Sequence, residues 1–313
     1  MKYKIYKMKF MSAVHFGNRT LEDGEYTFLA DTLFSALCQE AVKFGEDYLH
    51  EFYKKTKDGE ILFSDAFPYM GKKYFLPKPM MKIENDIHTG DSVIKKAYKK
   101  LKYIPADKFN DYLSGKFDVL NTENLDELGI HETKNVVSIR GKDETEPYRI
   151  GTYRFNEGNG LYFIVGYREE EGRFLIEDLL KSLMYSGIGG KRGSGFGRFE
   201  LYSDHVPKVI ENRLQQSEGY SMSLSICLPQ KSELKEAMEE AEYMVVKRSG
   251  FVQSETYSNT YLRKKDLYAF KAGACFSHKF SGDIYDVSTK EGQHAVYRYA
   301  KPLFMEVSIC RNI

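Results

Sequence analysis

The residues best suited to chemistry lie in one segment, SGIGGKRGSGFGR, at 186–198. Six of the eleven residues from Gly187 to Gly197 are glycine, and no acidic residue lies between Ser186 and Phe199. Glycine lets a backbone approach an anion closely and exposes its N–H groups, while the neighbouring lysine and arginines add positive charge. The segment therefore predicts a phosphate-binding loop.

The loop does not match the nucleotide-binding patterns. Lys191 is followed by Arg192 rather than by serine or threonine, and the segment follows a predicted helix, whereas a Walker loop follows a strand. Phe196 supplies a ring that could stack on a base. We therefore expect the backbone of a nucleic acid as the ligand. The alternative is a mobile linker between a helix and a strand.

Composition restricts where such a ligand could bind. The chain has 46 basic and 45 acidic residues and a net charge of +1, so positive charge must be local if RNA binds. The four cysteines (Cys38, Cys227, Cys275 and Cys310) lie far apart and form no C-x-x-C pair, which argues against a zinc knuckle and favours a reducing compartment. We expect no cofactor.

The sequence lacks the patterns expected of a secreted or membrane protein. The first ten residues alternate lysine with apolar residues and contain no continuous apolar stretch, which is not the pattern of a signal peptide. No apolar run approaches the length needed to cross a membrane. We therefore expect a cytoplasmic protein with no membrane contact.

The elements that must position the loop follow a recognisable order. Alternation predicts strands at 2–10 and 60–67, and helical spacing predicts a helix at 31–44, capped by Asp31 and ended by Gly45. A turn at NEGNG predicts a hairpin of 148–155 with 160–167. A second helix should end at Gly187, before a strand at 196–202. This β-α-β-β-α-β order is that of a ferredoxin-like, RRM-like domain.

The rest of the chain predicts one insertion and one further domain. Residues 82–146 are polar, include KKAYKKLK, and predict a loosely packed, partly mobile lobe or hairpin. A polar linker is expected at 205–219. A strand at 220–228, a helix at 232–241 and further strands repeat the pattern in shorter form. We therefore predict an α+β protein with two ferredoxin-like domains, at 1–204 and 220–313.

Several segments together resemble one family. GGKRGSGFGRFEL is similar to the glycine-rich signature of CRISPR-associated RAMP proteins. More narrowly, the chain resembles the type III-A Csm-complex subunits that cap the 5′ end of the guide RNA. This resemblance rests on HFGNRTLEDG (15–24), FLADTLFSALC (28–38), FSDAFPY with YFLPKP (63–79), KDLYAFKAGACF (265–276) and HAVYRYAKPLFM (294–305).

The resemblance implies a function and partners. It implies two RAMP domains that grip the repeat-derived 5′ handle of the guide RNA (crRNA), in assembly with a large polymerase/cyclase-like subunit and a backbone RAMP subunit. A protruding hairpin is expected to press between nucleotides at the handle boundary, and the lobe at 82–146 could supply it. The chain has no HD pair or GGDD motif, and the catalytic centres of such complexes lie in other subunits.

The resemblance also gives candidate RNA-binding residues. They comprise the loop, the segment after the first strand, and two groups in the second half: Gly189, Gly190, Lys191, Arg192, Gly193, Ser194, Gly195, Phe196, Gly197, Arg198; His15, Phe16, Arg19; Arg248, Ser249, Gly250; Tyr297, Arg298, Tyr299, Lys301. For the last two groups an ordinary sheet edge is the competing interpretation.

Two other functions remain open from the residues alone. A metal-independent endoribonuclease would need a general base and a general acid, for which His15 with Tyr26 or Lys191 are the candidates. A purely structural scaffold would use the helix at 31–44 and the phenylalanine-rich strands as partner surfaces. Asp65, Asp283 and Asp286 could hold a metal, but turn or capping roles are commoner for such residues.

Overall fold

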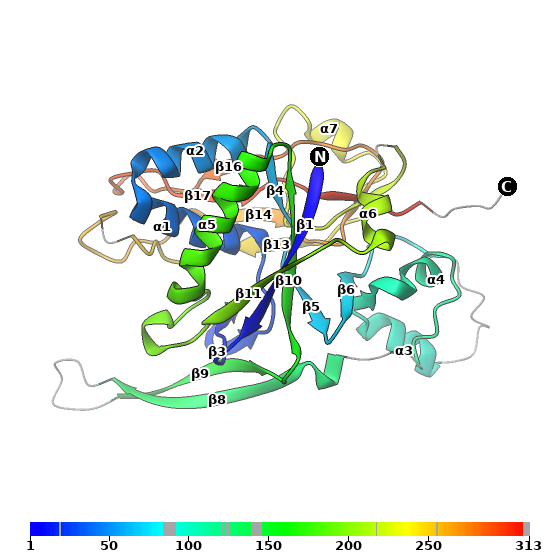
Figure 1. The fold of residues 1–313 in the computed structure, drawn as a ribbon, viewed down its shortest axis with the longest axis horizontal. Coiled ribbons are helices and arrows are strands. Elements are labelled where there is room, and N and C mark those ends of the chain that lie inside the picture. Colours follow the sequence, from blue (N-terminus) through cyan, green and yellow to red (C-terminus); the bar gives the residue numbers. More distant parts are fainter. Residues whose placement is uncertain are drawn as a thin grey trace.

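The first half is built on one antiparallel sheet, shown in Figure 1. The computed structural model describes residues 1–18, 20–83, 92–120, 122, 125–138, 146–216, 218–254 and 256–308. The sheet order is β11 (Phe199–Asp204), β1 (Lys2–Phe10), β10 (Asn159–Tyr167), β5 (Phe67–Met70), β6 (Lys73–Pro77) and β7 (Tyr103–Pro105), and β4 (Ile61–Phe63) also pairs with β10. Numbering the four ferredoxin strands along the chain gives the spatial order 4-1-3-2, as predicted for this fold.

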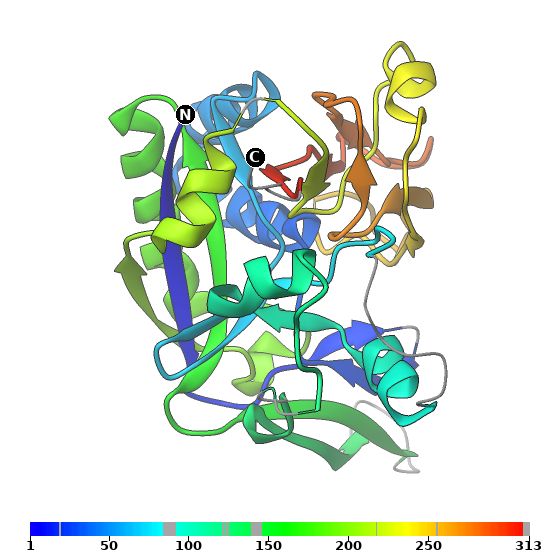
Figure 2. The ribbon, with the colours of Figure 1, turned by 90° about the vertical axis from the view of Figure 1, so that its right-hand side faces the viewer.

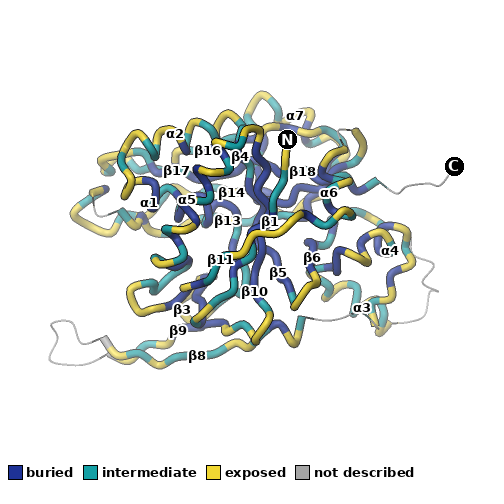
Figure 3. The backbone as a smooth tube through the Cα atoms, in the orientation of Figure 1, coloured by how far each residue is buried: buried dark blue, intermediate teal, exposed yellow. Residues whose placement is uncertain are grey.

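Three helices accompany this sheet and close the first core: α1 (Ala30–Phe44), α2 (Glu46–Lys57) and α5 (Glu170–Ser186). Leu33 and Leu37 of α1 and Leu179 and Leu183 of α5 are fully buried in this core. Figure 3 shows the buried residues concentrated along β10 and the inner faces of these helices. α1 ends at Gly45 and α5 ends at Gly187, which confirms both predicted helix ends.

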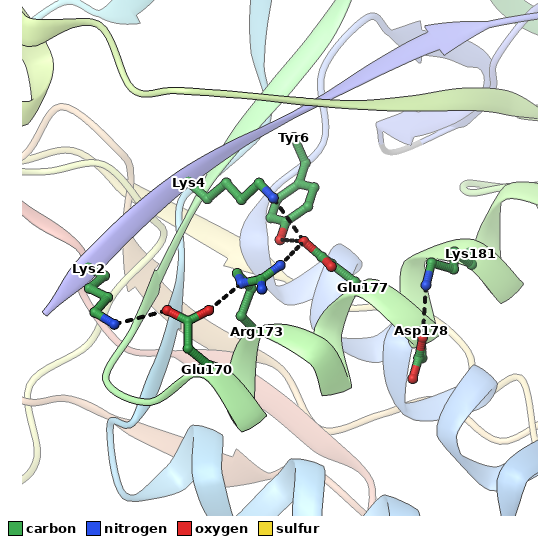
Figure 4. A network of polar contacts seen from close by, with 8 residues as sticks. All are labelled: Lys2, Lys4, Tyr6, Glu170, Arg173, Glu177, Asp178 and Lys181. Atoms are coloured by element: carbon green, nitrogen blue, oxygen red, sulfur yellow. Dashed lines mark hydrogen bonds and ion pairs between the residues drawn. The ribbon is translucent and has the colours of Figure 1, made fainter.

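Ion pairs fix α5 to the edge of β1, as Figure 4 shows. Glu177 accepts hydrogen bonds from Lys4 at 3.0 Å, from Tyr6 at 3.0 Å and from Arg173 at 2.8 Å. Glu170 accepts from Lys2 at 2.9 Å and from Arg173 at 2.7 Å. The lysines of β1 that lie on this side of the sheet are therefore neutralised by carboxylates.

The insertion is better packed than its composition predicts. It contains α3 (Ser92–Lys100), a 3-10 turn at Ala106–Lys108, α4 (Phe109–Leu113) and a second 3-10 turn at Leu125–Glu127. Ile104, Phe109 and Phe117 are buried in a second core, on the opposite face of the sheet from the first, with Ile5, Tyr162 and Ile164. The sequence did not indicate this packing, because the few aromatic and aliphatic residues that form it lie among many lysines.

The predicted hairpin of 148–155 with 160–167 is wrong. β9 (Glu146–Phe155) pairs instead with β8 (Gly129–Ser138) along its whole length. The apolar sequence of β10 suits it to the centre of the sheet, where it pairs with β1 and β5 and both its faces are buried. β9, which carries exposed polar side chains, is left to form the long β8–β9 ribbon that runs along the lower edge of the molecule in Figure 1.

Residues 205–219 are also more structured than the predicted linker. They include α6 (Lys208–Leu214), whose Ile210 and Leu214 are buried in the second core. The strands of the second half form small sheets, shown in Figure 2: β12 (Ser221–Ser223) with β15 (Cys275–Phe276) and β18 (Phe304–Glu306), β13 (Val245–Arg248) with β14 (Leu267–Phe270), and β16 (Asp283–Asp286) with β17 (Tyr297–Ala300). The predicted helix at 232–241 is reduced to α7 (Leu234–Ala237), on which Leu234 is exposed and Ala237 is buried.

Within the described ranges, no helix combines the length and apolar character required of a membrane span.

Candidate nucleic-acid interface

The glycine-rich loop between α5 and β11 is tied down by backbone hydrogen bonds. Gly190 N–H donates to the His15 carbonyl at 2.9 Å, and Gly197 N–H donates to the Ala13 carbonyl at 3.0 Å. Ile188 N–H donates to the Gly197 carbonyl at 3.0 Å, which closes the base of the loop. These hydrogen bonds hold the loop against the segment that follows β1. The loop therefore has a fixed conformation, unlike a mobile linker.

Two glycines are required by packing. Gly189 has φ 99°, and a Cβ there would lie 2.8 Å from the His15 carbonyl oxygen. Gly197 has φ 75°, and a Cβ there would overlap the Ile188 carbonyl. Gly193 and Gly195, in contrast, have open space where a Cβ would be. With Ser194 they form the exposed crest of the loop, around a short 3-10 turn at Arg192–Ser194.

Lys191 holds a strained conformation at the start of this crest. Its φ of 60° and ψ of 26° are left-handed, which is uncommon for a residue other than glycine. Its Nζ lies 4.9 Å from the ring centroid of Tyr148 on β9 and 3.5 Å from the Tyr148 hydroxyl. Lys191 is half-buried, and strain that the fold maintains at a partly accessible cation favours a functional role for that cation.

The cations of the loop have neutral partners. Arg192 donates to the amide oxygen of Gln39 on α1 at 2.7 Å, and Lys134 of β8 lies 4.7 Å from the ring centroid of Phe196. Among the described residues, no carboxylate is within ion-pair distance of Lys191, Arg192 or Lys134. Positive charge is thus left uncompensated here, unlike along β1.

A groove of about 520 Å³ opens beside these cations. Its lining joins three parts of the chain: Gly189, Lys191, Arg192 and Gly193 of the loop with Ser186, Gln39, Glu40 and Lys43 near α1, and Gln253 of the second half. Glu40 has a buried side chain and is neutralised by Lys43 at 2.7 Å. The groove can therefore accept an anion without a free opposing carboxylate on this wall.

Three expected contact residues lie under the loop rather than on it. Phe196 is 8% exposed and His15 is 5% exposed, and Phe16 is buried against Phe28. The His15 Nδ1 lies 2.7 Å from the Gly151 carbonyl oxygen, to which an Nδ1–H can donate. These side chains support the loop, and the Phe196 ring offers little surface for a base. Arg198 is exposed, and Arg19 lies outside the described residues.

Two arginines of the second half, Arg248 and Arg298, make an ion cluster with Asp31. Arg248 donates to both Asp31 oxygens at 2.8 Å and 2.9 Å, and Arg298 also pairs with this carboxylate. Although burial alone would raise the pKa of Asp31, Arg248 and Arg298 lower it to about 2. Asp31 therefore does not cap α1 as predicted. The capping role falls to Asp65, which accepts from the N–H of Ala30 at 2.7 Å.

The remaining candidates of the second half are placed mainly for packing. Tyr299 is fully buried and receives the Phe63 N–H at 3.0 Å, Lys301 is buried, and Tyr297 stacks on Tyr53 at 4.3 Å. Ser249 and Gly250 follow β13; Ser249 is exposed and Gly250 is half-buried. This group is not gathered at the glycine-rich loop, and we leave Tyr299, Lys301 and Arg298 out of the proposed site.

Sequence reasoning missed several residues that the fold brings to the loop, namely Lys134, Tyr148, Gln39 and Lys43. Their only sequence signals were the basic-aromatic composition of 148–155 and the polar face of the helix at 31–44. No cluster of metal-binding side chains occurs in the part of the chain that the structure describes. Cys38, Cys227 and Cys275 are free thiols, and burial raises the pKa of Cys227 and Cys275 to about 12.

Comparisons with known proteins agree with this architecture. The RAMP superfamily profile matches residues 7–200, and the profile of the CRISPR Csm4 C-terminal domain matches residues 216–307. The CRISPR system Cms protein Csm4 of Mycobacterium tuberculosis (strain CDC 1551 / Oshkosh) is 37% identical, with 97% of this chain and 98% of that protein covered. The protein of the same name from Streptococcus thermophilus is also 37% identical, with 99% and 100% covered.

Solved structures share the fold at lower identity. A chain in the Csm3–Csm4 subcomplex of the type III-A CRISPR-Cas interference complex superposes with a TM-score of 0.68 at 20% identity, covering 96% of this chain and 98% of that one. A chain in the Csm1–Csm4 cassette in complex with AMPPNP gives 0.61 at 18%, covering 99% and 100%.

Proposed function

The chain belongs to the Csm4 family of the RAMP superfamily, and from this premise we propose that it grips the 5′ handle of the guide RNA in a type III-A CRISPR effector complex. The observation that carries the proposal is the crest of the glycine-rich loop. There, Lys191 and Arg192 stand beside exposed backbone with no carboxylate partner among the described residues. A phosphate would supply the missing negative charge.

The β8–β9 ribbon is the element best suited to reach along the RNA. It contributes Lys134 and Tyr148 to the surroundings of the loop and runs along the lower edge of the molecule in Figure 1. We propose that this ribbon, rather than the whole lobe at 82–146, supplies the hairpin that presses between nucleotides. The residues that join its strands, 139–145, lie outside the described residues.

The complexes in which the structural neighbours were solved support a set of protein partners. One neighbour was solved in a Csm3–Csm4 subcomplex and another in a Csm1–Csm4 cassette. We propose that this chain likewise contacts a backbone RAMP subunit and the large polymerase/cyclase-like subunit, in the cytoplasm. The division of the chain into two domains, at 1–204 and 220–313, is part of this proposal.

A non-catalytic role fits the state of His15. A general base for RNA cleavage must reach the 2′-hydroxyl, directly or through one water. The His15 ring is buried, its Nδ1 faces the Gly151 carbonyl, and its other edge faces Gly17 and Gly190. The histidine is therefore suited to positioning the loop.

The experiment replaces Lys191 and Arg192 together by alanine in the reconstituted complex and measures guide RNA per complex. We expect less guide, and a shallower salt dependence of RNA binding by about 0.7 in log–log slope for each lost phosphate contact. Arg168→Ala with Lys181→Ala is the charge-matched control on an exposed surface elsewhere. Unchanged guide content and slope in the loop variant would refute the proposal.

A further inference from the structure

A ribbon in the second half presents basic and aromatic side chains to solvent. β13 pairs with β14 so that Lys247 lies opposite Tyr268, and beyond a bend Phe251 pairs with Arg263. Unbroken register would pair Phe251 with Lys264, so one extra residue is inserted in the second strand, as in a β-bulge. The bulge restores the alternation and keeps these side chains on one face.

This face carries two cation–aromatic pairs in succession. The Lys247 Nζ lies 5.9 Å from the centroid of Tyr268, and the Arg263 guanidinium lies 5.6 Å from the centroid of Phe251. Tyr268 is 57% exposed and Phe251 is 55% exposed. The opposite face of the ribbon is the packed one, where Val252 is buried and Ala269 is fully buried. The exposed rings therefore contribute little to the core.

The ribbon adjoins the groove beside the glycine-rich loop. Gln253, two residues beyond Phe251 and on the same side of the alternation, lines that groove with Lys191 and Arg192. Figure 1 shows the segment that follows β13 next to α1, and Gln39 and Lys43 of α1 also line the groove. A strand leaving the groove would meet Phe251 first.

Positive charge also exceeds negative charge beneath the ribbon. Arg248 and Arg298 share the one carboxylate of Asp31, and the Arg298 Nε has no hydrogen-bond partner among the described residues. On the outward face, Asp266 pairs with Lys247 at 2.7 Å, while Arg263 has no ion pair within the described ranges. The ribbon therefore suits a polyanion.

We propose that this face is a second contact surface for single-stranded RNA, on which Phe251 and Tyr268 stack on bases and Arg263 binds a phosphate. Aromatic rings beside cations are the chemistry by which single strands are held without reading their sequence. The inference rests on the proposed function, because the same guide RNA would continue from the groove onto the ribbon.

The test uses the full-length chain and a fluorescently labelled, unstructured single-stranded RNA of about 16 nucleotides, with affinity measured by anisotropy across a salt series. Phe251→Ala should weaken binding by a factor of about 5 to 150 without changing the salt slope. Arg263→Ala should reduce the slope by about 0.7. Phe174→Ala is the matched control, because this exposed ring also lies against a guanidinium, that of Arg173 at 4.3 Å, near the far end of α5.

The outcomes separate this inference from the proposed function. If Lys191→Ala with Arg192→Ala weakens binding while the ribbon variants match wild type, the ribbon surface is refuted and the loop stands. If none of these variants changes binding, both proposals fail. If the ribbon variants bind RNA normally but lose another subunit when the complex is purified, the face is a protein-docking surface and the inference is overturned.

Discussion

At the scale of single residues, the glycines of the loop fall into two groups with different roles. Gly189 and Gly197 lie against backbone carbonyls of His15 and Ile188, where no side chain fits. Gly193 and Gly195 lie on the open crest beside Lys191 and Arg192, which have no carboxylate partner among the described residues. The first pair holds the loop on the body of the protein, and the second pair leaves room for a ligand.

Gly189→Ala should therefore destabilise the protein, whereas Gly193→Ala should not. The Cβ at position 189 would meet the His15 carbonyl and would also need a left-handed backbone, so we expect a loss of roughly 1 to 3 kcal/mol in the free energy of unfolding. Urea unfolding of both variants measures the difference. Equal stabilities would show that the loop can shift to accept a side chain.

The side chains whose burial the sequence did not predict are aromatic. Phe196 and Tyr299 belong to segments whose composition suits a nucleic-acid surface, yet both rings are buried. An alternating strand such as YRYAK presents one face to the core, and the sequence alone does not say which. Lys191 and Arg192, which a helix end and a glycine-rich turn force outward, could be placed without the structure.

At the scale of elements, α1 joins the two halves through its first turn. Asp31 binds Arg248 at the end of β13 and Arg298 on β17. The neighbouring Asp65 receives N–H groups from Ala30 of α1 at 2.7 Å and from Ile226 of the second half at 2.9 Å. The contact between the halves thus depends on buried carboxylates.

Asp31→Asn should lower the free energy of unfolding near pH 7 by about 3 to 5 kcal/mol, because two arginines would be left beside a neutral group. Asp178→Asn, in an exposed pair with Lys181, is the control and should cost less than about 1 kcal/mol. Chemical unfolding measures both. A similar small loss in both variants would mean that solvent screens the Asp31 cluster.

The same carboxylate predicts a pH dependence. The pKa of Asp31 is lower in the folded state, about 2, than its ordinary value of 3.8, so acid protonates the unfolded chain first. Its stabilisation, about 2 kcal/mol, should be complete above about pH 5 and lost as the pH falls toward 2. Burial raises the pKa of Asp65 to about 7, which acts in the opposite direction as the pH rises. The difference between wild type and Asp31→Asn isolates the Asp31 contribution, and a difference that does not change with pH would contradict it.

Elements with strong local signals were predictable, and pairings between distant segments were not. Helical spacing and the glycines at 45 and 187 located α1 and α5. The partner of β9 was not predictable, because an adjacent turn favoured β10 while the apolar sequence of β10 suits it to the centre of the sheet. α6 was missed because only Ile210 and Leu214 anchor it among polar neighbours.

At the scale of the whole molecule, the two halves share their cores. Ile226, Ala269 and Tyr299 of the second half lie in the core under α1, and Met222 and Met305 lie in the core that contains Ile5. The overall charge of +1 hides a local excess of cations around the glycine-rich loop and the β13–β14 ribbon. Nearly balanced net charge is therefore compatible with RNA binding at one surface.

The measurement that tests the central claim most directly is ultraviolet crosslinking of the reconstituted complex to a labelled guide RNA, followed by mapping of the crosslinked peptides. We predict crosslinks from the 5′ handle to peptides containing residues 186–199 and to Tyr148, whose ring lies beside Lys191. Handle crosslinks confined to other subunits, with none in these peptides, would contradict the account and leave the glycine-rich loop a purely structural connection.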